Sequence, residues 1–164
     1  ISRLSIVAFK DGAWTEVRPA LNPAAAAAIS RTSLIGYSMS SFYTSLISNL
    51  LVDGMGRCIR HARRPKVLVA NLKQDHETPG MTVSGMLREM RDALRKSDTT
   101  PGEMQDYVHY ALVGDHGDSD ADGRVPVDLS EIRALGVEPI VLPLERSPGK
   151  HDPDLVAAVL LSLC

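Results

Sequence analysis

The sequence predicts an α/β protein in which helices cover both faces of a mostly parallel sheet, a three-layer α/β/α, Rossmann-like arrangement. Short apolar runs alternate with segments of helical periodicity, the order expected of right-handed βαβ units. Residues 66–72, KVLVANL, form an unbroken apolar run, as in a central strand buried on both faces. Residues 82–96 carry an apolar helical face: Val83, Met86, Met90 and Leu94.

The N-terminal part of the chain predicts a hairpin and a short helix. Residues 3–9 have the β-branched and aromatic content of a strand. The Asp-Gly pair within residues 10–20 predicts a turn that pairs this strand with a second one. Asn22 has the position of a helix N-cap and Pro23 that of the first helical residue, ahead of five alanines. These elements precede the first strand of the expected sheet.

The rest of the chain repeats an alternation of strands and helices. Residues 33–38 are expected as a strand, and residues 41–62 as a helix that breaks near Asp53-Gly54, since glycine weakens a helix. Beyond the helix at 82–96, the remaining segments follow in order: a strand over 106–115, a helix over 128–136, an edge strand over 137–144 and a helix over 151–163.

Composition excludes several classes of function. The net charge of −2 and the aromatic content of 4% argue against a nucleic-acid partner. No apolar run approaches the ~20 residues that span a bilayer, so no membrane partner is expected. Cys58 and Cys164 lack metal-ligand spacing and are expected as reduced thiols of a cytoplasmic protein, with no metal site.

The chain has 164 residues, enough for one domain with its own core. We therefore expect a single α/β domain over residues 1–164. The sequence starts at Ile1 rather than at a methionine, within strand-like sequence, and we expect it to be the C-terminal portion of a longer protein.

The loop after residues 33–38 is rich in hydroxyl groups and runs into a helix. Ser38, Ser40, Ser41 and Thr44 could donate to a phosphate or carboxylate, alongside the free N–H groups of the helix start. The alternative is that Ser41 is simply the N-cap of that helix. No glycine-rich phosphate-loop pattern is present to decide between the two interpretations.

A second polar cluster follows the central strand. Lys73, Asp75, His76 and Glu77 lie where that strand ends, and a histidine beside carboxylates suits acid–base chemistry or metal binding. The alternative is a solvated turn. The acidic run at 118–123 begins like a calcium loop but has Leu129 at the twelfth position, where an acidic residue is required, so calcium is not expected.

Four blocks of the sequence, in the same order, resemble the CofD/YvcK family. They are Asn22-Pro23, residues 41–54 (SFYTSL, NLLV and Gly54), residues 71–80 (NL, Gln74, ET and Gly80) and residues 151–155 (HDPDL). The family includes 2-phospho-L-lactate transferases and gluconeogenesis factors that bind UDP-sugars. The family's Gly-Pro-Gly is replaced here by Ser38-Met39-Ser40, so the close backbone approach of glycine is lost.

The resemblance implies a Rossmann-like fold and a nucleotide or nucleotide-sugar ligand, with a homodimer as a further expectation. We predict these ligand-binding residues: Asn22, Ser38, Ser40, Ser41, Tyr43, Thr44, Asn71, Glu77 and Thr78. The alternatives are a UDP-sugar-binding regulator of carbon metabolism or cell-wall precursor use, a phospholactate-transferase-like enzyme, and a domain that serves only as a partner surface. The enzyme would need a metal such as Mg²⁺, and His76 and Glu77 are the best candidates for its base.

Overall fold

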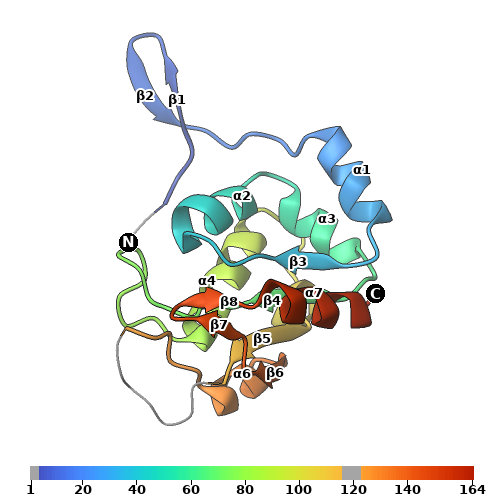
Figure 1. Ribbon diagram of the computed structural model, residues 1–164. Coiled ribbons are helices and arrows are strands. Elements are labelled where there is room, and N and C mark those ends of the chain that lie inside the picture. The colour runs from blue at the N-terminus through green and yellow to red at the C-terminus, as the bar shows by residue number, and fades with distance from the viewer. Residues whose placement is uncertain (1–3, 116–122) are drawn as a thin grey trace.

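The computed structural model describes residues 4–115 and 123–164. Its centre is a four-stranded parallel sheet in the order β3-β4-β5-β6 (Figure 1). The strands are β3 Ile35–Tyr37, β4 Lys66–Val69, β5 Tyr110–Gly114 and β6 Glu138–Leu142. All three strand pairs are parallel, so all four strands end at the same edge of the sheet, which we call the carboxyl edge. The opposite edge is the amino edge.

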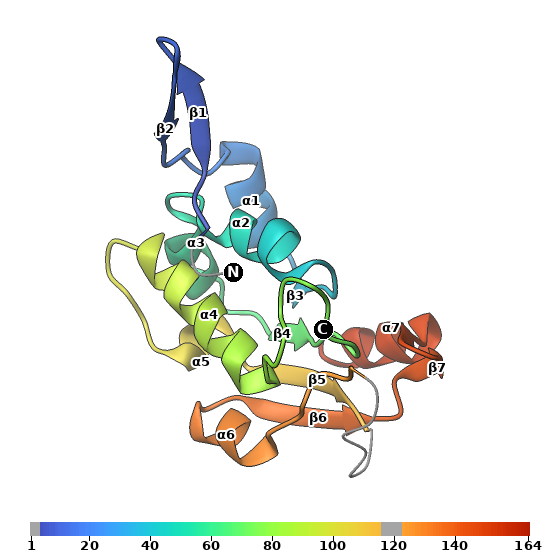
Figure 2. The same ribbon diagram turned by 90° about the vertical axis from the view of Figure 1, so that its left-hand side faces the viewer.

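Most of the helices cover one face of this sheet (Figure 2). They are the π-helix η1 Phe42–Ile47, then α2 Ser48–Leu50, α3 Met55–His61, α4 Val83–Lys96, α5 Met104–Tyr107 and α6 Leu129–Ala134. The predicted amphipathic helix is confirmed in α4. Met86, Met90 and Leu94 of α4 are at most 1% exposed and pack with Leu68 and Ala111 of the sheet.

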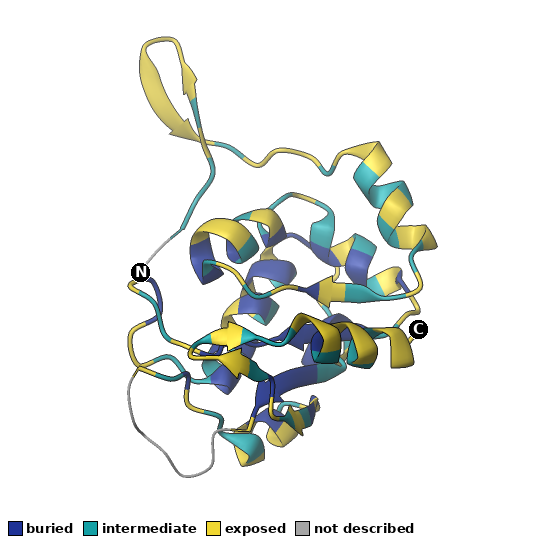
Figure 3. Ribbon diagram, viewed as in Figure 1, coloured by how far each residue is buried: buried dark blue, intermediate teal, exposed yellow. Residues whose placement is uncertain are grey.

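The second face of the sheet is covered by α7, Pro153–Ser162. Val156 of α7 packs on Val67, Val69 and Leu112 from the central strands, which are buried as the unbroken apolar run predicted. The outer side of α7 is exposed (Figure 3), and Leu161 is 73% exposed. Helices therefore lie on both faces of a parallel sheet, and the predicted α/β/α arrangement is confirmed.

The predicted N-terminal hairpin consists of β1 Val7–Lys10 and β2 Ala13–Glu16, and it projects from the body of the molecule (Figures 1 and 2). Asp11 and Gly12 both have positive φ, as a two-residue hairpin turn with right-handed strand twist requires. Phe9 and Trp14 face each other across the strands with ring centroids 5.3 Å apart. Both side chains remain exposed, Trp14 at 71%.

The helix caps at the N-terminal end are also confirmed. α1 spans Pro23–Arg31, and the Asn22 side chain accepts a hydrogen bond from the Ala24 N–H at 2.8 Å. The predicted break at Gly54 is confirmed too, because its φ of 87° ends the helical stretch before α3. The preceding helical segment differs from expectation in one respect, since it opens as the π-helix η1.

Two other segments differ from the prediction. The strand expected over 106–115 begins only at Tyr110, because a capping box between Glu103 and Asp106 starts the short helix α5. The strand expected over 137–144 ends at Leu142, and a small hairpin follows it, with β7 at Glu145–Ser147 and β8 at Lys150–His151. Residues 118–122 of the acidic run lie outside the described residues.

Within residues 4–115 and 123–164, no helix combines the length and the apolar character needed to cross a membrane.

Candidate functional site

The loops that follow β3 and β4 meet strand β8 at the carboxyl edge. The Asn71 side-chain amide, after β4, donates to the backbone carbonyl of Ser40, after β3, at 2.9 Å. The His151 Nε2–H, from β8, donates to the carbonyl of Ala70 at 3.0 Å. In open α/β sheets, ligands bind in the crevice beyond the carboxyl ends of the strands. These linked loops are therefore the candidate functional site.

Glu77 holds the start of η1. Its carboxylate accepts hydrogen bonds from the Thr44 hydroxyl at 2.7 Å, the Tyr43 N–H at 2.8 Å and the Thr44 N–H at 3.3 Å. The Thr44 hydroxyl is the largest cause that lowers the pKa of Glu77, and the two N–H groups add to it, although burial opposes the shift. Ser41 occupies the N-cap position, as predicted, but its side chain makes no capping hydrogen bond. The Glu77 carboxylate caps the helix in its place.

Asp75 explains how Glu77 reaches the helix. One oxygen of Asp75 accepts from the Glu77 N–H at 2.9 Å, the Thr78 N–H at 3.1 Å and the Thr78 hydroxyl at 3.0 Å. Asp side chains that bond to the backbone two and three residues ahead form a tight turn. Gln74 closes the same loop by accepting from the Gly80 N–H at 2.9 Å. The turn therefore directs the Glu77 side chain toward η1.

The structure brings most of the predicted ligand-binding residues together. Two hydrogen-bonded sets lie at the carboxyl edge: Glu77 with Tyr43 and Thr44, and Asn71 with Ser40. The Tyr43 ring is buried against Phe42, with centroids 5.2 Å apart. A ligand that used the N–H groups of Tyr43 and Thr44 would have to displace Glu77.

Three serines of this edge keep their hydroxyl groups available. Among the described residues, the hydroxyls of Ser38, Ser40 and Ser41 form no hydrogen bond with protein atoms. Ser38 and Ser40 are exposed and Ser41 is half-buried. These three hydroxyls are therefore the donors and acceptors that a ligand can reach at the loop after β3.

Three other predicted residues have different surroundings. Thr78 is 1% exposed and bonds to Asp75, so it supports the loop from within. Asn22 caps α1, and this helix packs against α3, as the contact of the Cys58 thiol with the Ala26 carbonyl shows. His76 is exposed, and its ring makes no hydrogen bond with the part of the chain that the structure describes.

The geometry bears on the predicted catalytic roles. A carboxylate that already accepts three hydrogen bonds and has a lowered pKa is a weak proton acceptor. The structure therefore favours a positioning role for Glu77. Within residues 4–115 and 123–164, no three His, Cys, Asp or Glu side chains gather as a metal site.

Sequence reasoning missed several residues of this edge. Arg124 forms an ion pair with Glu145 of β7 at 2.7 Å. Because residue 124 also forms an antiparallel bridge with residue 73, this ion pair connects the small hairpin β7–β8 to the loop after β4. His151 is half-buried, and burial lowers the pKa of its imidazole. It belongs to the HDPDL block of the family resemblance, but its bond to Ala70 joins positions 81 residues apart, and no local pattern reveals such a pair.

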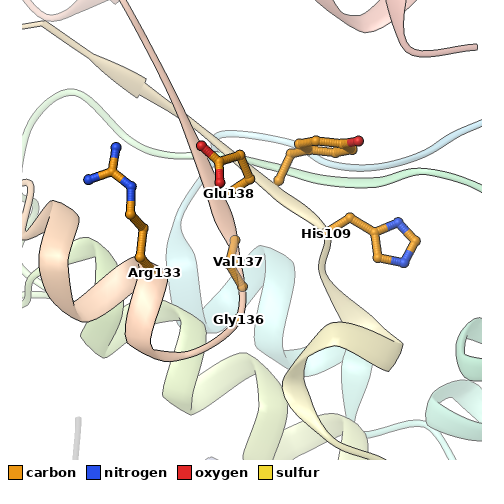
Figure 4. Close-up of a pocket in the computed structure, with 6 residues that line it drawn as sticks. His109, Arg133, Gly136, Val137 and Glu138 are labelled. Carbon is orange, nitrogen blue, oxygen red and sulfur yellow. The ribbon is translucent and has the colours of Figure 1, made fainter.

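A separate depression lies at the amino edge (Figure 4), with a volume of about 430 Å³. It is lined by His109, Tyr110, Arg133, Gly136, Val137 and Glu138, where β5 and β6 begin. Burial lowers the pKa of His109, whose Nδ1 accepts from the Lys66 N–H at 3.3 Å. In contrast to the carboxyl edge, no loop-to-loop hydrogen bond of Arg133 or Glu138 side chains organises this surface among the described residues.

The parallel sheet, its flanking helices and the linked loops at the carboxyl edge define a Rossmann-like α/β protein. A model of the family described as "2-phospho-L-lactate transferase CofD" matches residues 7–144, and the chain belongs to this CofD family, which includes the gluconeogenesis factors.

Two curated relatives are both named "Putative gluconeogenesis factor". The Nostoc sp. protein is 31% identical over 157 residues, which is 87% of this chain and 32% of the relative. The Thermotoga maritima protein is 38% identical over 71 residues, which is 43% of this chain and 23% of the relative. The chain thus spans a third or less of the length of these relatives.

Two crystal structures of a Bacillus halodurans protein, described in one of them as a member of the UPF0052 family, share the fold. They superpose with TM-scores of 0.74 and 0.73 at 24% and 26% identity. Each alignment covers 87% of this chain and 47% of the other.

Proposed function

We propose that this chain binds a nucleotide or nucleotide-sugar ligand of the UDP-sugar type at the carboxyl edge of its sheet. The observation that carries the proposal is the link between the loops after β3 and β4, formed by Glu77 with Thr44 and by Asn71 with Ser40. This link fixes the backbone at Ser40, while the hydroxyl groups of Ser38, Ser40 and Ser41 stay available. A preorganised loop loses less conformational freedom on binding, which favours affinity.

Titration calorimetry on the full chain with UDP-N-acetylglucosamine, UDP and GDP tests this proposal. We expect heat of binding from at least one nucleotide, and no heat from any of them would refute it. The double substitution Ser40→Ala with Ser41→Ala should weaken binding about fivefold or more, because two hydroxyl contacts are lost. Ser30→Ala is the matched control, since its hydroxyl bonds only to the Ala27 carbonyl within α1.

A transferase is the second candidate, and the family description "2-phospho-L-lactate transferase" favours it. In that case, the same loops would hold a nucleotide-activated donor, and an acceptor hydroxyl would attack the phosphorus. Release of free nucleotide from such a donor, dependent on an added acceptor, would distinguish an enzyme from a binding protein. Binding of nucleotide without any turnover would favour the regulatory role.

A further inference from the structure

The proposed ligand carries a diphosphate group, and the start of η1 does not offer it the usual free N–H groups. Helix N-termini usually receive phosphates through free backbone N–H groups. Here the Tyr43 and Thr44 N–H groups donate to Glu77, so they are already engaged. A cationic side chain is one source of the positive charge that offsets a diphosphate.

The basic side chains of the described residues near this edge fall into two groups, those with and those without an ion pair. Arg124 pairs with Glu145 at 2.7 Å and Arg146 pairs with Asp154 at 3.3 Å, so both are partly neutralised. Lys73 and Lys150 are exposed and form no ion pair with described residues. These two lysines are therefore the candidates for a contact with an anionic ligand.

Lys73 differs from Lys150 because its side chain packs against the backbone of a glycine. Gly149, in the turn between β7 and β8, has a φ of 75° and no side chain. A Cβ atom at this position would lie 2.7 Å from Cδ, 2.9 Å from Cε and 3.2 Å from Cγ of Lys73. The aliphatic stem of Lys73 thus rests against the bare backbone of Gly149, which limits the freedom of a long side chain that is otherwise costly to order.

The backbone of Lys73 is fixed as well. Residue 73 forms an antiparallel bridge with residue 124, and the Gln74 N–H donates to the Gly123 carbonyl at 2.7 Å. Asn71, which bonds to Ser40, lies two residues earlier, or about 7 Å of extended chain. Lys73 therefore follows, within two residues, the side chain that holds the hydroxyl loop.

We propose that Lys73, seated on Gly149, is the residue that binds the diphosphate of the nucleotide ligand at the carboxyl edge. This inference rests on the proposed function. The serine hydroxyls of the loop after β3 and the Lys73 ammonium then contact the ligand from two neighbouring strand ends, and Gly149 acts as a positioning residue through the lysine.

Calorimetry of UDP, GDP and uridine with Lys73→Met and Lys150→Met tests the assignment. Lys73→Met should raise the dissociation constant of UDP or GDP at least about tenfold, because a contact between charged groups is lost. The same substitution should leave the affinity for uridine unchanged. Lys150→Met should bind UDP or GDP with an affinity within about twofold of that of the unsubstituted chain.

If the unsubstituted chain binds UDP or GDP and Lys73→Met binds it equally well, the inference is wrong and the proposed function stands. If the unsubstituted chain binds no nucleotide, both are wrong.

A double-substitution cycle tests the role of Gly149. Gly149→Ala should weaken UDP or GDP binding by moving Lys73, whereas the combination with Lys73→Met should bind no more weakly than Lys73→Met alone. Any strain of alanine at positive φ is present in both backgrounds and cancels in this comparison. Additive losses would show that Gly149 does not act through Lys73. Should Gly149→Ala fail to fold, as judged by circular dichroism, the two lysine substitutions still decide the proposal.

Discussion

The two edges of the sheet differ in how far their polar side chains join neighbouring loops. At the carboxyl edge, Glu77 and Asn71 each cross to a neighbouring loop and fix its backbone. At the amino edge, Arg133 and Glu138 border a depression of about 430 Å³ without joining one loop to another (Figure 4). The hollowed surface is thus not the better organised one. A binding site needs groups held in place, and the volume of a surface depression does not report this.

The largest effect that would sharpen this comparison is expected at Glu77. Glu77→Ala removes a buried acceptor of three hydrogen bonds and the cap of η1, so we expect the free energy of unfolding to fall by about 2–3 kcal/mol. Urea denaturation followed by circular dichroism measures the change. Glu138→Ala, an exposed glutamate of the amino edge, is the control and should stay within about 0.5 kcal/mol. Equal losses in both variants would contradict the distinction between the edges.

A smaller effect is expected from the histidines, since each edge holds one whose pKa is lowered by burial. For His151 and His109, the folded-state pKa lies below the ordinary value of 6.5, so the unfolded chain binds protons first as the pH falls. Their contribution to stability is complete above the unfolded-state pKa and is lost as the pH falls through the folded-state pKa. The unfolding free energy should therefore be lower at pH 5.5 than at pH 7.5.

Denaturation at these two pH values, with His151→Gln and His109→Gln, separates the contributions of the two edges. Each substitution should reduce the pH dependence, and ring-proton NMR titrations should place both imidazole pKa values below 6.5. An unchanged pH dependence in both variants would show that other groups account for it.

The smallest effect is expected at Arg133, which lines the depression of the amino edge. Arg133→Ala should leave nucleotide affinity within about twofold and stability within about 0.5 kcal/mol, because the side chain is exposed and forms no hydrogen bond or ion pair with another described loop. Calorimetry and urea denaturation provide both measurements. A loss of affinity as large as that expected for Lys73→Met would move the candidate site to the amino edge.

The elements that were predictable from the sequence are those determined by residues close together in the chain. The apolar run of β4, the periodicity of α4, and the Asn22 and Pro23 start of α1 each depend on neighbouring residues. Helix α5 was also readable in principle, since the Glu103 and Asp106 capping box is a local pattern, but the apolar residues around it suggested a strand.

The arrangement of the site was less predictable, because its key contacts are distant in sequence. Glu77 and Thr44 are 33 residues apart, and their bond depends on the turn that Asp75 closes. The resemblance singled out both residues, yet it did not reveal that they bind each other. The contact of Lys73 with Gly149 depends on the small hairpin β7–β8, which is distant from residue 73 in sequence.

The projecting hairpin has a practical consequence for all of these measurements. Trp14 is the single tryptophan of the chain, and it lies on β2 with 71% of its surface exposed, away from the sheet core. Its intrinsic fluorescence therefore senses the local environment of the hairpin, and loss of the central core would change the emission little. The same placement makes Trp14 a built-in optical probe for any molecule that covers the hairpin, since shielding from water shifts indole emission to the blue.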